Sequence, residues 1–299
     1  MSGSIAGPAV HSPAVHVIGA SGRSGAALCR ALAAAGRAFV PVVRDRRRWA
    51  AVGLDTPPRL ADLGDPASLA GALGAAAVVV SCAHARHVPA ILRAAPAAGR
   101  FVFLGSTRRF SRWPDAHGGG VQRGEQAFLA SGRPGVMLHP TMIYGAQGED
   151  NVQRLARLLG RLPLVPLPGG GRALVQPIHQ SDVTAALLAA LHHPWAAPAS
   201  LVIAGPAPLA YRDFVRAVAK AAGRRPPRIV AVPVTALRAL APLLHLLPGP
   251  RVTGAELRRL TEDKAFDITP ARAQLGFDPL SLDEGLRRTF PPPPALPLS

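Results

Sequence analysis

Short apolar segments alternate with longer segments of helical character along the first half of the chain. The apolar segments are typical of buried strands and cover residues 15–18, 39–43, 77–81, 101–104 and 135–138. The segments between them with helical spacing cover residues 22–35, 68–73, 87–98 and 122–130. Apolar strands that alternate with helices are typical of a parallel sheet covered on both faces, so the pattern predicts an α/β fold with a doubly wound parallel sheet.

The second half of the chain follows a less regular pattern. Helical spacing recurs at residues 152–159, 182–191, 211–222 and 253–260, with a strand candidate at 201–203. Residues 162–172 are rich in proline and glycine, which predicts a loop. The most apolar segment, residues 229–247, predicts a packed helix, because two prolines, an arginine and a histidine interrupt it too often for a membrane span.

No segment has the composition of a linker between two domains. We expect a first domain over residues 14–150 and a smaller mixed lobe over residues 151–290 that packs over its open end, with flexible tails at 1–13 and 291–299. The N-terminal residues lack the basic and apolar regions of a secretory signal, so we expect a cytoplasmic protein without a membrane partner.

Composition narrows the class of protein further. The chain has 34 Lys and Arg against 17 Asp and Glu, a net charge of +17, and with only two lysines this charge is almost wholly arginine. The arginine clusters at residues 44–48, 108–112 and 224–228 carry no DNA-reading motif, so nucleic acid is not the expected partner. Two cysteines exclude a disulfide framework, and no His, Asp or Glu spacing predicts a metal site.

A glycine-rich turn joins the first predicted strand to the first helix. Gly19 permits the tight turn, Gly22 lets the backbone approach a pyrophosphate, and Gly25 lets the helix lie close to the sheet. Free N–H groups at the helix start face the anion. Placed directly after a strand and opening a helix, this spacing predicts a dinucleotide site of the Rossmann type. The other residues of the turn expected to contact the cofactor are Ser21, Arg23 and Ser24.

The end of the second strand indicates which dinucleotide is bound. An NAD site places an acid there for the ribose 2′-hydroxyl, whereas Arg44 comes first here and its guanidinium suits a 2′-phosphate. We therefore expect NADP(H), with NAD(H) left open because Asp45 follows and would reverse the preference if it faced the ribose. The alternative is that residues 44–48 form a solvated basic turn.

Further candidates lie at the carboxyl ends of other strands, where ligands bind in such sheets. Asp62 or Leu63 is expected near the adenine. Ser81, Cys82 and Ala83 are small enough for the cofactor to lie against backbone. Other polar residues that follow predicted strands and are candidates for contacting substrate are Ser106, Thr107, His84 and His87.

In this order and spacing, the motifs resemble the short-chain dehydrogenase/reductase superfamily, in particular its extended and atypical branch of epimerase/dehydratase-like and NmrA-like proteins. The matching segments are residues 19–25, 43–45, 61–65, 78–83, 104–107, 139–145, 176–183 and 275–279. The resemblance implies a Rossmann domain with a C-terminal substrate lobe. It also implies that Pro140 and Thr141 contact the nicotinamide end of the cofactor, and it places His139 where the family usually has arginine.

The superfamily's catalytic pair, a tyrosine with a lysine four positions later, is absent. Neither Tyr144 nor Tyr211 is followed by lysine at that spacing. Gly124-Glu125 resembles the Gly-Glu after that lysine in relatives, which puts His117 at the tyrosine position and Val121 at the lysine position. Imidazole titrates near neutrality, so His117 is a catalytic candidate, although its segment, residues 117–120, reads as a flexible glycine turn. Ser106 and Thr107 could hydrogen-bond a substrate carbonyl.

Two classes of function stay open. One is an NADP(H)-preferring oxidoreductase or epimerase, acting on a small molecule or nucleotide sugar with acid–base groups other than the usual pair. The alternative is a non-catalytic dinucleotide-binding sensor or assembly factor. The sequence does not fix the oligomeric state and leaves a homodimer open.

Overall fold

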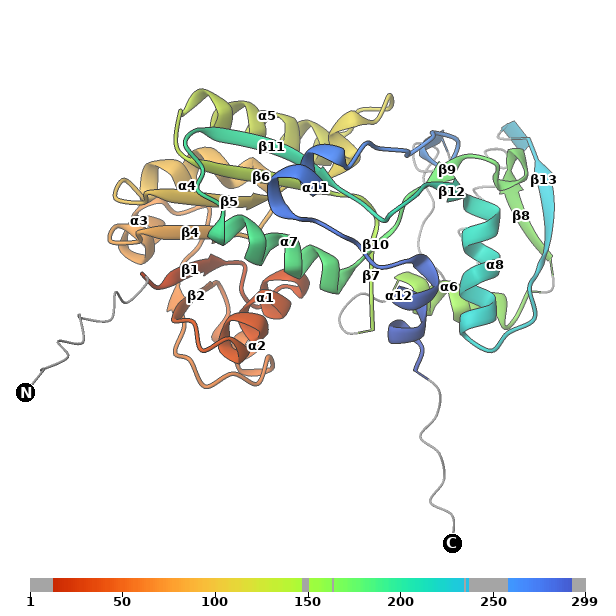
Figure 1. Ribbon diagram of the computed structural model, residues 1–299, viewed down its shortest axis with the longest axis horizontal. Helices are drawn as coiled ribbons and strands as arrows, with labels where there is room; N and C mark the ends of the chain where they lie inside the picture. The colour runs from red at the N-terminus through yellow and green to blue at the C-terminus, as the bar shows by residue number, and fades with distance from the viewer. Residues whose placement is uncertain (1–12, 147–150, 163, 234, 237–257, 292–299) are drawn as a thin grey trace, which may run out of the picture.

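The computed structural model describes residues 13–146, 151–162, 164–233, 235–236 and 258–291 (Figure 1). The expected tails at 1–13 and 291–299 therefore lie outside the described residues except for Pro13 and Pro291. Residues 253–257 of one expected helix and 237–247 of another also lie outside them.

A parallel sheet of seven strands forms the centre of the molecule (Figure 1), in the order β11-β6-β5-β4-β1-β2-β3. Every pairing in this sheet is parallel. Because β1 lies between β2 and β4, successive crossovers run in opposite directions from it and open a crevice at the carboxyl ends of β1 and β4. The strands are β1 (Val15–Ile18), β2 (Phe39–Val43), β3 (Arg59–Leu60), β4 (Val78–Ser81), β5 (Arg100–Leu104), β6 (Gly135–Pro140) and β11 (Pro198–Ile203).

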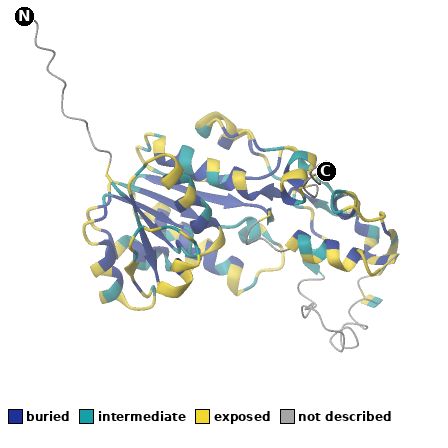
Figure 2. Cartoon of the chain, turned by 90° about the horizontal axis from the view of Figure 1, so that it is seen from below, coloured by how far each residue is buried: buried dark blue, intermediate teal, exposed yellow. Residues whose placement is uncertain are grey.

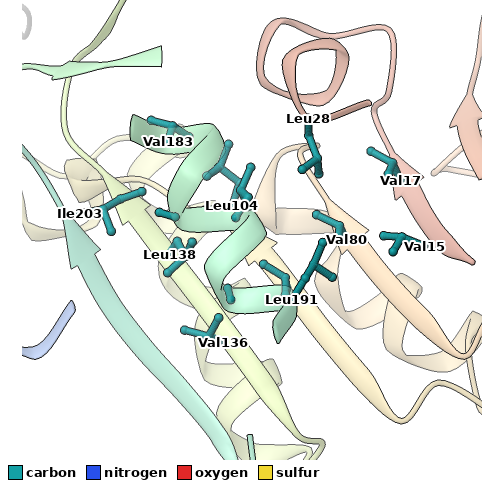
Figure 3. Close-up of a cluster of buried hydrophobic side chains, with 14 of the residues drawn as sticks. Val15, Val17, Leu28, Val80, Leu104, Val136, Leu138, Val183, Leu191 and Ile203 are labelled. Carbon is teal, nitrogen blue, oxygen red and sulfur yellow. The ribbon is translucent and has the colours of Figure 1, made fainter. Parts of the chain in front are cut away.

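Helices cover both faces of this sheet, which leaves the strands buried (Figure 2). On one face, Leu28 and Leu191 pack against the strand valines (Figure 3). On the other, Leu69, Ile91 and Phe128 form a second apolar cluster. The first face is covered by α1 (Arg23–Ala34), α7 (Gln180–His192) and α11 (Thr269–Leu275), and the second by α3 (Pro66–Leu73), α4 (Val88–Ala94) and α5 (Ala116–Ala130). The doubly wound sheet expected from the sequence is thereby confirmed.

A smaller group of elements lies at one end of the sheet (Figure 1). Its apolar residues form two clusters of their own, one around Tyr144 and Phe214 and one around Leu167 and Val215. The helices are α6 (Asn151–Leu159), α8 (Tyr211–Ala221) and α12 (Leu282–Thr289). Three strand pairs complete the group: β7 (Ile143–Tyr144) with β10 (Ile178–His179), β9 (Leu174–Val175) with β12 (Leu209–Ala210), and β8 (Leu164–Pro168) with β13 (Arg228–Val232).

Two expectations for the second half are wrong. The loop expected at 162–172 contains β8, and the helix expected from residue 229 begins as β13. Among the described residues, β8 and β13 pair only with each other. Each strand therefore has one edge without a partner strand, where a proline, which has no N–H donor, is tolerated.

Three boundaries in the first half also differ from expectation. Residues 117–120 are not a loose turn: α5 begins six residues before the expected helix, because Asp115 caps it by accepting a hydrogen bond from Gly118 N at 2.8 Å. Residues 46–50 form the short helix α2 (Arg46–Ala50) rather than a turn, and Arg46, Arg47 and Arg48 are exposed on it. The helix expected over 87–98 is confined to α4, preceded by η1 (Ala85–His87). No described helix is long and apolar enough to cross a membrane.

The close approach of α5 to η1 predicts that Gly124→Ala destabilises the fold. A Cβ at Gly124 would lie 2.0 Å from the Ala85 carbonyl oxygen, so the helix would have to move. Overpacking typically costs about 1–3 kcal/mol, more than the 0.5–1 kcal/mol or so by which alanine is preferred to glycine within a helix. Urea unfolding followed by circular dichroism measures the change. The control is Gly71→Ala in α3, where nothing lies within 4 Å of the added Cβ; equal unfolding midpoints for the two variants would contradict the prediction.

Candidate functional site

The turn between β1 and α1 has the geometry of an anion cradle. Gly19 adopts a positive φ of 73°, and Gly22 N donates to Gly19 O at 2.9 Å. A Cβ at Gly25 would lie 2.2 Å from Gly19 O, so only glycine fits there without displacing the turn. The helix N-cap, Gly22, has no side-chain cap hydrogen bond. The first N–H groups of α1 are thus presented toward the crevice for an anion to accept.

A cavity of about 470 Å³, here called the β2 cavity, opens beside this turn. It is lined by five of the residues expected to bind the cofactor: Gly19, Ser21, Arg44, Asp62 and Leu63. The sequence analysis did not single out two further lining residues, Arg48 and Arg86, and it placed His87 in the substrate cleft rather than here. Arg86 follows β4 closely, next to His87, so the rule of strand ends could have found it as well.

Asp45 also lines the β2 cavity, but its carboxylate is engaged in capping α2. Its Oδ1 accepts hydrogen bonds from Arg47 N at 2.8 Å and Arg48 N at 3.4 Å. Arg44 is the first residue after β2 and has no such role in the helix cap. The charged groups around this cavity are therefore dominated by guanidinium.

The residues after β4 connect the β2 cavity with the middle of the crevice. A Cβ on Gly19 would lie 3.2 Å from Ala83 N, so the two loops touch. Ser81 is buried, and its hydroxyl oxygen has no hydrogen-bond partner among the residues that the structure describes. Burial raises the pKa of the Cys82 thiol to about 12, so this cysteine is protonated at neutral pH and is not a nucleophile.

A second cavity of about 620 Å³, the β5 cavity, lies at the carboxyl ends of β5 and β6. The chain after β5 contributes Ser106 and Thr107, and the chain after β6 contributes Thr141. Apolar side chains from Phe110, Met142, Leu260 and Phe266 line it as well, together with Arg259 and Lys264. The residues from 259 onward were missed, because they are far in sequence from any strand of the sheet and only tertiary structure brings them here.

Ser106 and Thr107 differ in how their hydroxyl groups are used. Thr107 Oγ1 donates to the Pro140 carbonyl oxygen at 3.1 Å, which ties the β5 loop to the end of β6. Ser106 Oγ instead accepts a hydrogen bond from Arg108 N at 3.2 Å, which leaves its own proton for a ligand. Ser106 is therefore the better placed of the two to donate to a substrate carbonyl.

A buried polar network holds the Ser106 backbone in position. Ser106 N donates to His139 Nδ1 at 3.2 Å, so the ring proton is on Nε2, which lies 3.2 Å from Glu125 Oε1. Ser200 Oγ donates to the same carboxylate at 2.5 Å, and Arg109 forms an ion pair with it. His139, which stands where the family usually has arginine, is fully buried and acts here as a structural link.

The ionisation of Glu125 follows from this network. Burial alone would raise the pKa of Glu125, but the hydrogen bonds from His139 and Ser200 and the charge of Arg109 outweigh it and lower the pKa below its ordinary value. The carboxylate is therefore ionised at neutral pH although it is buried.

The remaining candidates for acid–base chemistry lie away from the β5 cavity. His117 is exposed in the first turn of α5, with its ring packed edge-on to His84 at a centroid distance of 4.4 Å. Burial, together with nearby positive charge, lowers the pKa of both imidazoles, that of His84 to about 4. Tyr144 lies in the apolar core, and burial raises its pKa and that of Tyr211. The structure thus does not bring His117, Tyr144 or Tyr211 to the lining of the cavity.

Two further points complete the site. Val121, at the position of the family's lysine, is buried in the apolar cluster between α5 and the sheet. Among the described residues, no group of three or more His, Cys, Asp or Glu side chains could hold a metal ion.

No protein-family model matches the chain, and no curated protein matches it. Solved structures share its fold. An NADPH-dependent quinone oxidoreductase from Escherichia coli gives a TM-score of 0.73 at 18% identity, over 92% of this chain and 99% of that one. A nucleoside-diphosphate-sugar epimerase from Pseudomonas aeruginosa gives 0.70 at 20% identity, over 93% and 96%.

A UDP-glucose 4-epimerase from Thermotoga maritima, solved with UDP-glucose, gives a TM-score of 0.69 at 15% identity, over 92% of this chain and 97% of that one. These similarities extend over nearly the whole chain, although few residues are identical. The chain therefore has the Rossmann-type α/β fold of short-chain dehydrogenase- and epimerase-like proteins, which confirms the fold that the sequence predicts.

The buried carboxylate predicts a pH-dependent contribution to stability. Because the pKa of Glu125 is lower in the folded protein than its ordinary value of 4.5, the ionised group stabilises the fold fully above that value. The stabilisation is lost as the pH falls through the lower folded pKa. Glu125→Gln should therefore lower the free energy of unfolding at pH 7 by about 1–3 kcal/mol, because the amide carries no charge to pair with Arg109 and has one acceptor oxygen instead of two, and the difference from wild type should shrink in acid.

Urea unfolding at neutral and acidic pH measures this dependence. Glu284→Gln is the control, because Glu284 pairs with Arg287 and Arg288 on the outside of α12 and its loss should change stability little. A Glu125→Gln difference that is the same at both pH values would show that the charge of Glu125 is not what stabilises the network.

Proposed function

We propose that the protein is an NADP(H)-dependent oxidoreductase or epimerase acting on a small molecule or nucleotide sugar. The observation that carries this proposal is the pair of cavities along one edge of the sheet, the first beside an uncapped helix N-terminus and the second over Ser106. The solved structures with this fold include an NADPH-dependent quinone oxidoreductase, a UDP-glucose 4-epimerase with UDP-glucose, and a protein in complex with UDP-glucose and NAD.

The cofactor would extend along the carboxyl edge of the sheet. The pyrophosphate would lie against the turn at Gly19, Gly22 and Gly25, which can be this tight because Gly25 has no Cβ to meet the Gly19 carbonyl oxygen. The adenosine half would lie in the β2 cavity against Asp62 and Leu63. The side chains from Ser81 to Ala83 are small, so the cofactor could lie against the backbone there. The Ser81 hydroxyl, which has no partner among the described residues, could form a hydrogen bond with it. The nicotinamide would then reach Pro140 and Thr141 at the β5 cavity.

The preference for NADP(H) rests on the charges of the β2 cavity. Arg44, Arg48 and Arg86 line it, and they supply forked cations that suit a 2′-phosphate. Asp45, the acid that would favour NAD(H), is held by the N-terminus of α2. The bound dinucleotide would supply hydride chemistry, while Ser106 would hold the carbonyl or hydroxyl oxygen of the substrate by a hydrogen bond.

A second candidate function is a dinucleotide-binding sensor or assembly factor without turnover. The absence of a Tyr-x-x-x-Lys pair from the sequence favours it. The burial of Val121 supports it further, and so does the absence of His117 from the lining of the β5 cavity. The two candidates share the cofactor site and differ in whether the β5 cavity performs chemistry.

Titration with NADPH and NADH, followed by nicotinamide fluorescence, tests the cofactor assignment. We expect tighter binding of NADPH. Arg44→Ser should weaken NADPH by about 1–3 kcal/mol and leave NADH nearly unchanged, because only NADPH carries the 2′-phosphate. Arg93→Ser, an exposed position on α4 outside the lining of the β2 cavity, is the matched control. Equal losses for the two dinucleotides would remove the basis for NADP(H), and absence of binding would refute the proposed function.

Turnover separates the enzyme from the binding protein. Purified protein with NADPH is incubated with a panel of quinones, ketones, aldehydes and UDP-sugars, and oxidation at 340 nm and product formation are measured. An enzyme should turn over at least one class, with Ser106→Ala lowering kcat by removing the hydrogen bond. NADPH that is bound tightly and never consumed would favour the sensor or assembly factor.

A further inference from the structure

Lys264 is placed in the β5 cavity with the residues proposed to hold substrate. It is one of two lysines in the chain, and it lines this cavity with Ser106, Thr107 and Thr141. It comes from the segment before α11. This segment is far in sequence from the ends of β5 and β6 but lines the same cavity. The primary amine of Lys264 therefore belongs to a side chain that lines the same cavity as the hydroxyl residues at the ends of β5 and β6.

A hydrogen bond holds the amine in place, and both acidic and basic side chains lie around it. Lys264 Nζ donates to the Arg259 carbonyl oxygen at 2.7 Å, and the side chain is half-buried. Glu262 is the nearby acid, and its carboxylate accepts hydrogen bonds from Ser111 Oγ at 2.8 and 3.0 Å. The other charged residues that line the cavity are Arg108, Arg112, Arg259 and Asp263.

These surroundings make the ammonium group easier to deprotonate. Burial lowers the pKa of Lys264, the charge of Glu262 partly opposes this effect, and the charge of Arg259 lowers the pKa further. A lysine in such a setting can exchange protons closer to neutral pH, whereas an arginine cannot lose its proton.

We propose that Lys264 is the catalytic acid–base group of the β5 cavity, in place of the absent tyrosine. In the reducing direction, bound NADPH would supply the hydride for the carbonyl carbon of the substrate and would end as NADP⁺. The Lys264 ammonium group would give its proton to the carbonyl oxygen, so that C=O becomes CH–OH, and the resulting neutral amine would be reprotonated by water. In the reverse direction the neutral amine of Lys264 would accept the proton of the substrate hydroxyl. The proposal rests on the proposed function, because it needs the nicotinamide beside the cavity.

The presence of only two lysines makes a direct test practicable. Reductive methylation with ¹³C-formaldehyde labels both amines, and Lys264→Arg and Lys220→Arg identify their NMR signals; the terminal amine is recognised by its own shift. Lys220 is exposed in the last turn of α8 and serves as the internal reference. Titration without cofactor should give Lys264 a lower pKa than Lys220, and therefore a larger fraction of free amine at a given pH.

A comparison of the NADP⁺ and NADPH complexes then tests whether Lys264 lies beside the nicotinamide. The nicotinamide ring is positively charged in NADP⁺ and neutral in NADPH, so an amine next to it should titrate lower with NADP⁺ than with NADPH. A merely structural lysine would not distinguish the two. Equal titration of Lys264 in both complexes, or a pKa like that of Lys220, would overturn the proposal while leaving the proposed cofactor site intact. Failure of both dinucleotides to bind would refute the proposed function and this inference with it.

Turnover of a panel substrate adds a kinetic readout. Lys264→Met should slow NADPH oxidation by about 10²–10⁴-fold and remove the pH dependence due to this amine, with NADPH affinity and circular dichroism unchanged. Lys220→Met should change neither. Undiminished kcat in Lys264→Met would show that the proton comes from another group.

Discussion

The contact between Gly25 and the Gly19 carbonyl is the constraint on which the candidate site depends. A Cβ at Gly25 would lie only 2.2 Å from that oxygen, so α1 can start this close to β1 only without a side chain there. The close start leaves Gly22 as an uncapped N-cap and aims the first N–H groups at the crevice. The same turn touches Ala83 after β4, which brings two strand ends together at the reversal of the sheet. The anion cradle and the crevice are thus consequences of one backbone contact.

The second constraint is the charged network below the β5 loop. Ion pairs are costly to bury unless they are supported by hydrogen bonds, and Glu125 accepts two such bonds at Oε1, from His139 and Ser200, while its Oε2 forms the ion pair with Arg109. His139 connects this network to the β5 loop, because its Nδ1 accepts a hydrogen bond from Ser106 N. An arginine at position 139 has no acceptor nitrogen and could not receive that bond. The departure from the family pattern at this residue is therefore matched to the backbone of the loop that lines the cavity.

What could be predicted from the sequence is local in origin. The glycine turn and the position of Arg44 depend on residues within one strand–helix junction, and their spacing alone places them at the strand ends. Features that depend on distant partners were missed. The segment containing β8 is rich in proline and forms a strand because β13, some sixty residues later, pairs with it. The role of Asp115 in starting α5 was hidden by glycines that usually indicate a turn, and the location of Lys264 follows from tertiary contacts.

Those tertiary contacts explain how a residue so late in the chain reaches the β5 cavity. Asp115 Oδ2 accepts hydrogen bonds from Arg108 Nε and Arg259 Nη1, both at 2.8 Å, so one carboxylate joins the β5 loop, the start of α5 and the C-terminal segment. Ser111 bonds to Glu262 within the same region, and Leu174 O accepts from Lys264 N at 2.9 Å. The segment from 259 to 264 is thereby anchored on both sides. His117 at the start of α5 does not line the cavity, so this anchored segment is the part of the described chain that brings a titratable amine to the strand ends.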